Sequence, residues 1–168
     1  MNKISSISES IEPYESKRKR VASQIGRFLE QNFIEEKIIE AVTFPQFAEV
    51  YKNKLSRIHD HRALATLGDA LLSAVIVNQF YSPTSTKKTL TKEKERLANN
   101  ERLQKIGKQW FEAKDLLFWC NNDLESNICY ATLVEAIIGA LLLSSGYDTC
   151  VDFVQKKIIN ISCDSIPH

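Results

Sequence analysis

Two long apolar stretches, each with a single carboxylate near its middle, constrain the fold of this chain more than any other feature. The first stretch, residues 63–77, contains Asp69, and the second, residues 130–143, contains Glu135. A helix that is apolar on nearly all sides belongs in a core. A carboxylate in such a helix is costly unless a cation, a metal or hydrogen-bond donors meet it. The sequence therefore predicts two core helices whose acids need a partner.

Each stretch also carries a polar stripe along one helical face. In the first stretch, steps of four, three and four residues connect Arg62, Thr66, Asp69 and Ser73. In the second, steps of three and four residues connect Thr132, Glu135 and Gly139. If the stripes face each other, Asp69 and Glu135 can share one magnesium ion, which prefers oxygen ligands. The alternative is an internal ion pair or cap, because a single buried acid is more often met by Arg, Lys or backbone.

The composition is that of one ordinary globular domain. The 168 residues are 43% hydrophobic and 26% charged, and the formal charge of +1 argues against a uniformly basic nucleic-acid binder. The positive charges are nevertheless gathered into local clusters, at Lys17–Arg20, Lys52/Lys54/Arg57, Lys87/Lys88, Lys92/Lys94/Arg96 and Lys156/Lys157. Such clusters on one face can contact phosphates. Solvated helix faces are an equally good interpretation of any one of them.

Cysteine usage and hydropathy indicate the compartment. The four cysteines show no CxxC spacing and no zinc-site histidine partner, which predicts reduced thiols in an intracellular protein. We expect no signal peptide, because no apolar segment opens the chain. A cytoplasmic location is expected, with a nuclear one open if Lys17–Arg20 acts as a targeting signal. Asp69 and Glu135 interrupt the longest apolar runs, so no membrane span is expected.

Helical periodicity runs through the chain, and no alternating strand pattern occurs, so we expect an all-α fold. Residues 1–14 are expected to form a flexible arm, residues 15–161 a single domain, and residues 162–168 a tail. The expected helices cover residues 15–32, 35–41, a segment from 45, 60–81, 90–97, 100–113, and two segments near the C-terminus.

The helix that carries Glu135 has predictable ends. Ser126 or Asn127 is expected to cap its start, because both side chains accept hydrogen bonds from first-turn N–H groups. Gly146 is expected to end it, as glycine commonly does.

The residues around both acids resemble the motifs of the ribonuclease III family. Residues 62–72 are similar to the family's signature E-R-L-E-F-L-G-D-A-V-L, and residues 131–140 to its second motif, A-D-x-x-E-A-L-I-G-A. Between them, residues 90–103 resemble L-T-x-x-R-x-x-L-V-S-N-E-x-L, and upstream residues 39–43 resemble L-L-x-A-L-T-H. The order and separations of the four segments fit across residues 22–158.

This resemblance implies an endonuclease-domain-like helical bundle that acts on double-stranded RNA as a dimer. Its carboxylates would hold Mg²⁺ or Mn²⁺, which activates water for attack on a phosphodiester. Asp69 and Glu135 match two of the family's four acids, and are the predicted catalytic and metal-binding residues. The chain ends soon after the last expected helix, so we expect it to lack a double-stranded-RNA-binding domain.

Other family positions are altered. Ala65 and Thr132 replace two acids, Arg62 replaces the first glutamate of the signature, and Thr66 replaces an aromatic residue of the dimer contact. With half of the metal-binding carboxylates gone, hydrolysis is expected to be weakened or lost. Two carboxylates could still hold magnesium more weakly, because this ion keeps several waters.

Upstream residues could replace a lost ligand. His61 is spaced four and eight residues before Ala65 and Asp69, so His61 or its neighbour Asp60 is a candidate metal helper. A histidine near a helix start is more often a surface residue or a cap. Thr132 could contribute a hydroxyl without charge. A metal phosphohydrolase of the His-Asp type is excluded, because His59 is the first histidine and that site needs one further upstream.

The hypotheses are therefore an active endonuclease with a reduced ligand set, and a non-catalytic ribonuclease III fold that binds structured RNA or pairs with another chain. A homodimer, or a heterodimer with an intact chain, fits both. The candidate RNA contacts follow the loop after the signature helix, at Lys87, Lys88, Lys92 and Lys94.

Overall fold

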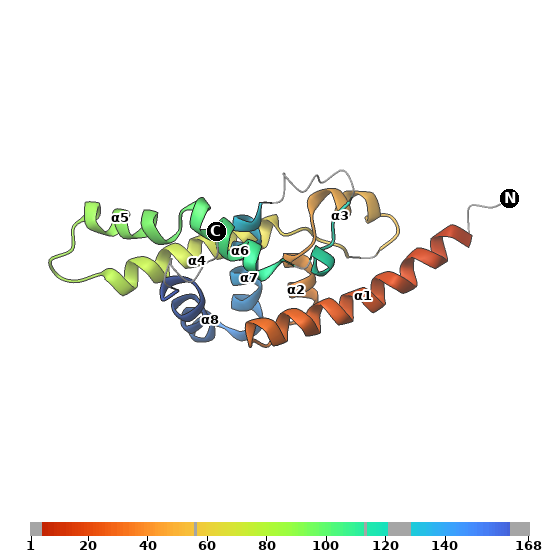
Figure 1. Cartoon of the computed structure of the whole chain (residues 1–168), viewed down its shortest axis with the longest axis horizontal. Helices are drawn as coiled ribbons and strands as arrows, with labels where there is room; N and C mark the ends of the chain where they lie inside the picture. The colour runs from red at the N-terminus through yellow and green to blue at the C-terminus, as the bar shows by residue number, and fades with distance from the viewer. Residues whose placement is uncertain (1–4, 56, 113, 121–128, 162–168) are drawn as a thin grey trace.

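The computed structural model describes residues 5–55, 57–112, 114–120 and 129–161. Figure 1 shows its helices, which are α1 (Ser5–Leu29), α2 (Glu35–Ala41), α3 (Pro45–Tyr51), α4 (Arg62–Phe80), α5 (Lys87–Leu97), α6 (Asn100–Trp110), η1 (Lys114–Leu116), α7 (Tyr130–Ser145), α8 (Tyr147–Val154) and the π-helical turn η3 (Gln155–Ile159). Within these ranges there is no strand, only an isolated bridge between Thr43 and Phe118. The expected all-α fold is confirmed.

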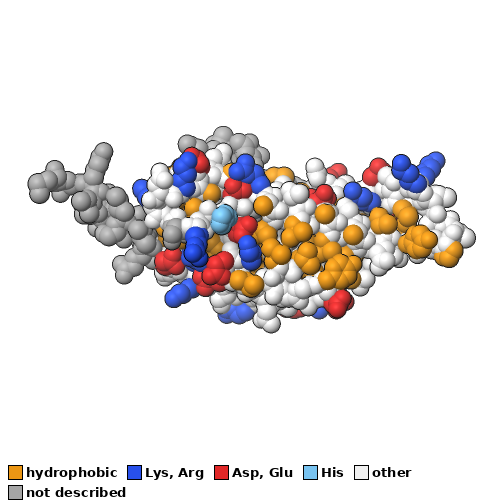
Figure 2. All heavy atoms as spheres, turned by 180° about the vertical axis from the view of Figure 1, so that it is seen from behind, with side chains coloured by type: hydrophobic (Ala, Val, Ile, Leu, Met, Phe, Trp, Pro, Cys, Tyr) orange, Lys and Arg blue, Asp and Glu red, His pale blue; other side chains and the backbone are white. Residues whose placement is uncertain are grey.

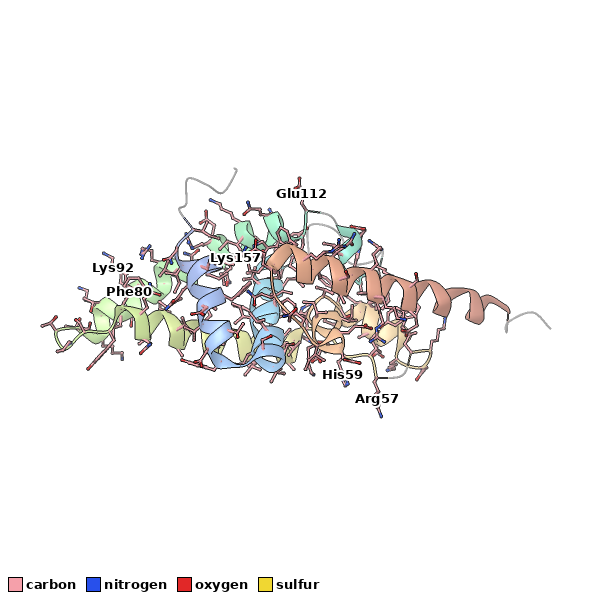
Figure 3. The ribbon with its side chains drawn as sticks, turned by 90° about the horizontal axis from the view of Figure 1, so that it is seen from below. Arg57, His59, Phe80, Lys92, Glu112 and Lys157 are labelled. Atoms are coloured by element: carbon pink, nitrogen blue, oxygen red, sulfur yellow. The ribbon has the colours of Figure 1, made fainter. Side chains whose placement is uncertain are left out.

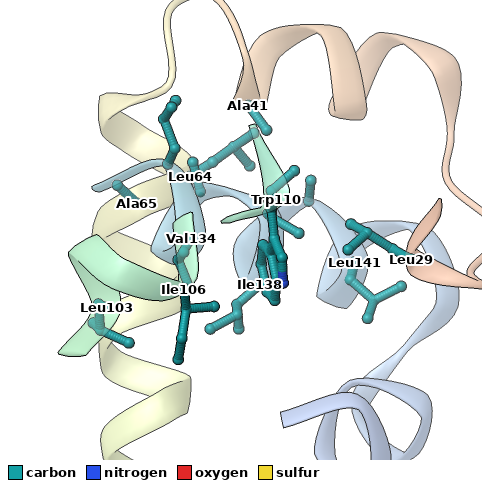
Figure 4. Packing of buried hydrophobic residues seen from close by; sticks show 14 of the residues in the cluster. Leu29, Ala41, Leu64, Ala65, Leu103, Ile106, Trp110, Val134, Ile138 and Leu141 are labelled. Atoms are coloured by element: carbon teal, nitrogen blue, oxygen red, sulfur yellow. The ribbon is translucent and has the colours of Figure 1, made fainter. Parts of the chain in front are cut away.

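The core is built around α7. This helix stands in the middle of the molecule, with α4 and α6 packed against it, while α4 and α5 extend to one end as a hairpin and α1 to the other (Figure 1). Leu133, Ile137 and Leu141 of α7 are completely buried. Figure 4 shows side chains from α4, α6 and α7 meeting in one cluster, including Leu64, Ile106 and Ile138. The apolar composition of α7 is thus explained by burial on all sides.

Two glycines let the backbones of α4 and α7 touch. A Cβ atom added to Gly68 would lie 1.8 Å from the carbonyl oxygen of Glu135, and one added to Gly139 would lie 2.2 Å from the carbonyl oxygen of Leu64. No side chain fits at either position, because a Cβ atom would overlap the backbone of the facing helix. This crossing lies within one chain, and it fixes the register of the two helices that carry the acids.

The N-terminal segment differs from the expectation. Helix α1 begins at Ser5, within the segment expected to be a flexible arm. The sequence contains the reason, because Ile4, Ile7, Ile11 and Tyr14 follow one another at steps of three, four and three residues. The same helical spacing of apolar residues continues into the helix expected at residues 15–32. The helix therefore starts earlier than expected, while the domain boundary at residue 14 stays a prediction, and the expected tail at 162–168 lies outside the described residues.

The ends of α7 are formed differently from each other. Its N-cap is Cys129, whose side chain makes no capping bond, and Ser126 and Asn127 lie outside the described residues. Instead, the Oε1 atom of Gln104 on α6 accepts a hydrogen bond from the Ala131 amide at 3.0 Å. A tertiary contact from α6 thus meets the first turn of α7, and the expected local cap stays a prediction. At the other end Gly146 has φ 84°, which confirms the predicted glycine stop.

Helix α4 is the one helix in the described ranges with the length and hydropathy of a membrane span, judged by composition alone. In this fold it is a core helix, since it packs along α7 and carries Asp69 within it. Core helices commonly have this composition, and nothing further follows from it.

Arg102 joins α6 to the C-terminal turn. Its side chain is buried, and its guanidinium donates hydrogen bonds to the carbonyl oxygens of Ile158 at 2.7 Å and Ile161 at 3.0 Å. These bonds satisfy carbonyl groups at the end of η3 that have no helical partner. Arg102 therefore acts as a tertiary cap.

Replacing Arg102 with methionine is expected to lower the free energy of unfolding by about 2 to 3 kcal/mol, because it leaves buried carbonyl oxygens without charged donors. Urea denaturation followed by circular dichroism measures this. The matched control is Arg96→Met on α5, which removes an exposed ion pair with Glu93 and should cost less than about 1 kcal/mol. Equal losses in the two variants would contradict the capping role.

Candidate functional site

Asp69 and Glu135 come together where α4 and α7 cross. Asp69 follows Gly68, and the backbone of Gly68 touches the backbone of Glu135. The two acidic residues are therefore neighbours across the helix crossing. Asp69 is exposed and Glu135 is half-buried. Burial raises the pKa of the Glu135 carboxyl to about 7, and the negative charge of Asp69 adds to this rise. The structure therefore brings together the two acids that the sequence singled out.

Among the described residues, no cationic side chain neutralises this acid pair. Within the part of the chain that the structure describes, neither Asp69 nor Glu135 forms an ion pair. Arg62, the candidate partner on the same stripe, instead binds Asp60, with its Nη2 atom 2.8 Å from Oδ2 and its Nε 2.9 Å from Oδ1. This hydrogen bond lowers the pKa of Asp60. The internal ion pair that the sequence left open is thus made by Asp60 and not by Asp69 or Glu135.

The altered family positions contribute no charge to the acid pair. Ala65 is buried in the packing between α4 and α7 (Figure 4). The hydroxyl of Thr132, one turn before Glu135, donates a hydrogen bond to the Sγ atom of Cys129 at 3.0 Å. Thr66 is exposed, and its hydroxyl donates to the carbonyl oxygen of Arg62 at 3.1 Å. Asp69 and Glu135 are therefore the two carboxylates of this pair.

His61 occupies a structural position. It is the N-cap residue of α4 and is buried, with its ring packed edge-on against Phe44 at a centroid distance of 5.1 Å. Its backbone N–H donates to the carbonyl oxygen of Thr43 at 3.0 Å. Among the described residues, no three His, Cys, Asp or Glu side chains are grouped as a metal site. The structure therefore does not gather His61 or Asp60 with the acid pair.

The four candidate lysines lie along α5, on the outer part of the α4–α5 hairpin, and all are exposed. Helical spacing places Lys88 and Lys92 on one face, and Lys87 and Lys94 on another. Figure 3 shows Lys92 at the end of the molecule that also holds Phe80. The structure thus separates the lysines from the acid pair along α4.

One face of α4 was missed by the sequence analysis. The helix was expected to be buried on nearly all sides, but Ala63, Ala70 and Ala74 are exposed and Val77 is half-buried. Figure 2 shows hydrophobic side chains gathered along this side of the molecule. The signal was the small size of these residues, which offer little area for core packing. We call these four residues the α4 stripe.

An all-α domain with adjacent acids on two crossing core helices has the architecture of a ribonuclease III nuclease domain. The solved nuclease domain of ribonuclease III from Campylobacter jejuni superimposes on this chain with a TM-score of 0.67, covering 80% of this chain and 93% of the other at 20% identity. A second structure of that nuclease domain gives a TM-score of 0.65. At this identity, the likeness establishes the fold.

The family follows from the sequence itself. The model of the Ribonuclease-III-like family matches residues 32–161, and the chain belongs to this family. Ribonuclease 3 of Flavobacterium psychrophilum is 32% identical over 107 residues, which are 60% of this chain and 42% of that protein. Ribonuclease 3 of Clostridium acetobutylicum is 28% identical over 126 residues, or 71% and 53% of the two chains. The chain thus spans about half or less of these relatives.

Proposed function

We propose that this chain binds double-stranded or structured RNA in RNA processing, as a ribonuclease III-like domain whose metal-dependent hydrolysis is weakened. The observation that carries the proposal is the acid pair of Asp69 and Glu135, two adjacent carboxylates that no cationic side chain of the described residues neutralises. The altered Ala65 and Thr132 account for the weakening. The site of action is intracellular, where such RNA is found.

The acid pair suits Mg²⁺ or Mn²⁺ by its chemistry. Both ions prefer carboxylate oxygens, and magnesium tolerates a small protein ligand set because it keeps several waters. Burial and, second to it, the negative charge of Asp69 raise the pKa of Glu135, and a divalent cation would offset that charge. When bound, the metal would supply a water of lowered pKa for hydrolysis. Asp69 and Glu135 would hold it, more weakly than four carboxylates would.

The remaining contacts with RNA would be electrostatic. The exposed Lys87, Lys88, Lys92 and Lys94 would bind phosphates, so affinity should fall steeply with salt. The α4 stripe is the proposed dimer face, because it is an apolar surface on a helix otherwise used in the core. The nuclease domain from Campylobacter jejuni is itself described as flexible in a region involved in dimer formation. The partner would be a second copy or an intact ribonuclease III chain.

Cleavage of a long RNA duplex by the purified chain tests this function. With Mn²⁺ or Mg²⁺, we expect slow cleavage that Asp69→Asn and Glu135→Gln each reduce by about a hundredfold or more, because each removes half of the charge that holds the metal. The control is Glu95→Gln, an exposed acid on α5 that should leave the rate unchanged. Gel analysis of end-labelled RNA gives the rates.

A gain-of-function variant separates a weakened enzyme from a non-catalytic fold. Thr132→Asp restores a family acid one turn before Glu135 and should raise the cleavage rate and the metal affinity. Absence of cleavage by the parent chain and by Thr132→Asp, with duplex binding intact in both, would contradict the weakened-enzyme proposal. That result would favour an RNA-binding or dimer-partner protein.

A further inference from the structure

A groove crosses the surface between the start of α4 and helices α1 to α3. Two cavities of about 360 and 460 Å³ share Glu40, Ile58 and His59, and therefore form one continuous depression. One half is bounded by residues of α1 and α2, and the other reaches Arg62 and Ala63 in the first turn of α4. We call this depression the His59 groove.

Most charges that line the His59 groove are already paired. The ion pairs are Arg18 with Glu15 and Glu35, Lys37 with Glu40, Lys52 with Glu49, and Arg62 with Asp60. Arg57 and His59 are different, because both are exposed and neither has a hydrogen-bond, ion-pair or ring partner among the described residues. The unpaired acid of the lining, Glu36, is exposed on the first turn of α2. The groove therefore presents two donors that the fold itself does not use.

The backbone at this point is also unusual. Arg57 has φ 59°, in the left-handed region that a long side chain rarely adopts. Such conformations persist where the surroundings hold them, and they concentrate at functional sites. Figure 3 shows Arg57 and His59 next to each other, both projecting from the edge of the molecule. In Figure 2 a histidine lies at the surface among charged side chains, beside the hydrophobic side of α4.

We propose that the His59 groove is a phosphate-binding subsite for RNA, in which Arg57 and His59 donate to the oxygens of one backbone phosphate. The guanidinium fork suits two phosphate oxygens, and an imidazole N–H adds a third hydrogen bond. The groove reaches Arg62, which lies seven residues before Asp69 on the same face of α4, about 10 Å along the helix axis. One strand lying along α4 can thus contact both places. This inference rests on the proposed function and extends its RNA contacts.

The salt dependence of duplex-RNA binding tests the subsite. Arg57→Gln should reduce the slope of log K against log salt by about one unit and weaken binding about tenfold near 0.1 M salt. His59→Gln should weaken binding by a smaller factor. The matched control is Lys54→Gln, which removes a charge from the same segment outside the groove lining, where Lys54 lies over the Tyr51 ring. Lys54→Gln should leave the slope unchanged.

A second measurement separates this inference from the proposed function. In NMR spectra of the full chain, inorganic phosphate should shift the Arg57 side-chain and His59 ring signals in the absence of any RNA. RNA binding with the parent salt slope in Arg57→Gln, or equal losses in Arg57→Gln and Lys54→Gln, would overturn the subsite and leave the proposed function standing. Phosphate shifts without any RNA binding by the chain would overturn the RNA assignment and the proposed function together.

Discussion

Gly68→Ala is expected to lower the free energy of unfolding by about 3 kcal/mol, at the upper end of overpacking costs. The added methyl group would lie 1.8 Å from the carbonyl oxygen of Glu135, which belongs to backbone that cannot rotate away. Helices α4 and α7 would have to separate, and the rest of the core would lose contact with them. Gly139→Ala should have a similar effect, because its methyl group would lie 2.2 Å from the Leu64 carbonyl oxygen. Urea denaturation measures both.

The control for this prediction is the same substitution at Gly26. There the added Cβ atom would lie 3.1 Å from the carbonyl oxygen of Gln31, a contact that a small shift relieves. The better helix propensity of alanine offsets part of the cost, so Gly26→Ala should change stability by less than about 1 kcal/mol. Similar stabilities for Gly68→Ala and Gly26→Ala would show that the helix crossing tolerates expansion, contrary to the geometry.

Glu135→Gln is expected to stabilise the metal-free protein at pH 8 by about 1 to 2 kcal/mol. The folded-state pKa of Glu135 is raised from 4.5 to about 7, mainly by burial and further by Asp69. Between pH 4.5 and about 7, the folded state therefore holds a proton that the unfolded state has lost. The free energy of unfolding consequently falls as pH rises through this window. The glutamine stays neutral and escapes this loss. The expected stabilisation is smaller than the full pKa shift would give, because Glu135 is partly solvated.

Urea midpoints between pH 4 and pH 8.5 measure this effect. The two proteins should be equally stable near pH 4, and should diverge as pH rises towards 8. Mn²⁺ at pH 8 should stabilise the parent chain more than Glu135→Gln, because a cation that binds the folded state raises its stability. If the difference in stability between the parent chain and Glu135→Gln is the same at pH 5 and pH 8, the raised pKa of Glu135 is refuted.

The central helices and the acid pair were predictable from sequence because their signals are local. An unbroken apolar run around Asp69 or Glu135 identifies a core helix, and the family motifs place both acids together. The crossing at Gly68 and Gly139 could not be predicted in the same way, because it is a backbone contact between residues distant in sequence.

The predictions that failed depend on tertiary contacts or on weak signals. The contact of Gln104 with the start of α7 could not be predicted, because it joins two helices distant in sequence. The exposed face of α4 was missed because alanine is compatible with both burial and exposure. The early start of α1 was missed because its isoleucines are few and widely separated by polar residues. Whether His61, the four lysines and the acid pair bind their predicted ligands stays a prediction.

The glycine crossing has a consequence for comparing members of this family. Because Gly68 and Gly139 let the backbones of the two central helices touch, a substitution at either position acts on folding, whether or not the chain cleaves RNA. The glycines in the G-D of α4 and the E-A-x-x-G of α7 are thus explained by the scaffold, independently of any metal that the neighbouring acids bind. The proposed weakening of hydrolysis depends on other positions, which Ala65 and Thr132 occupy in this chain.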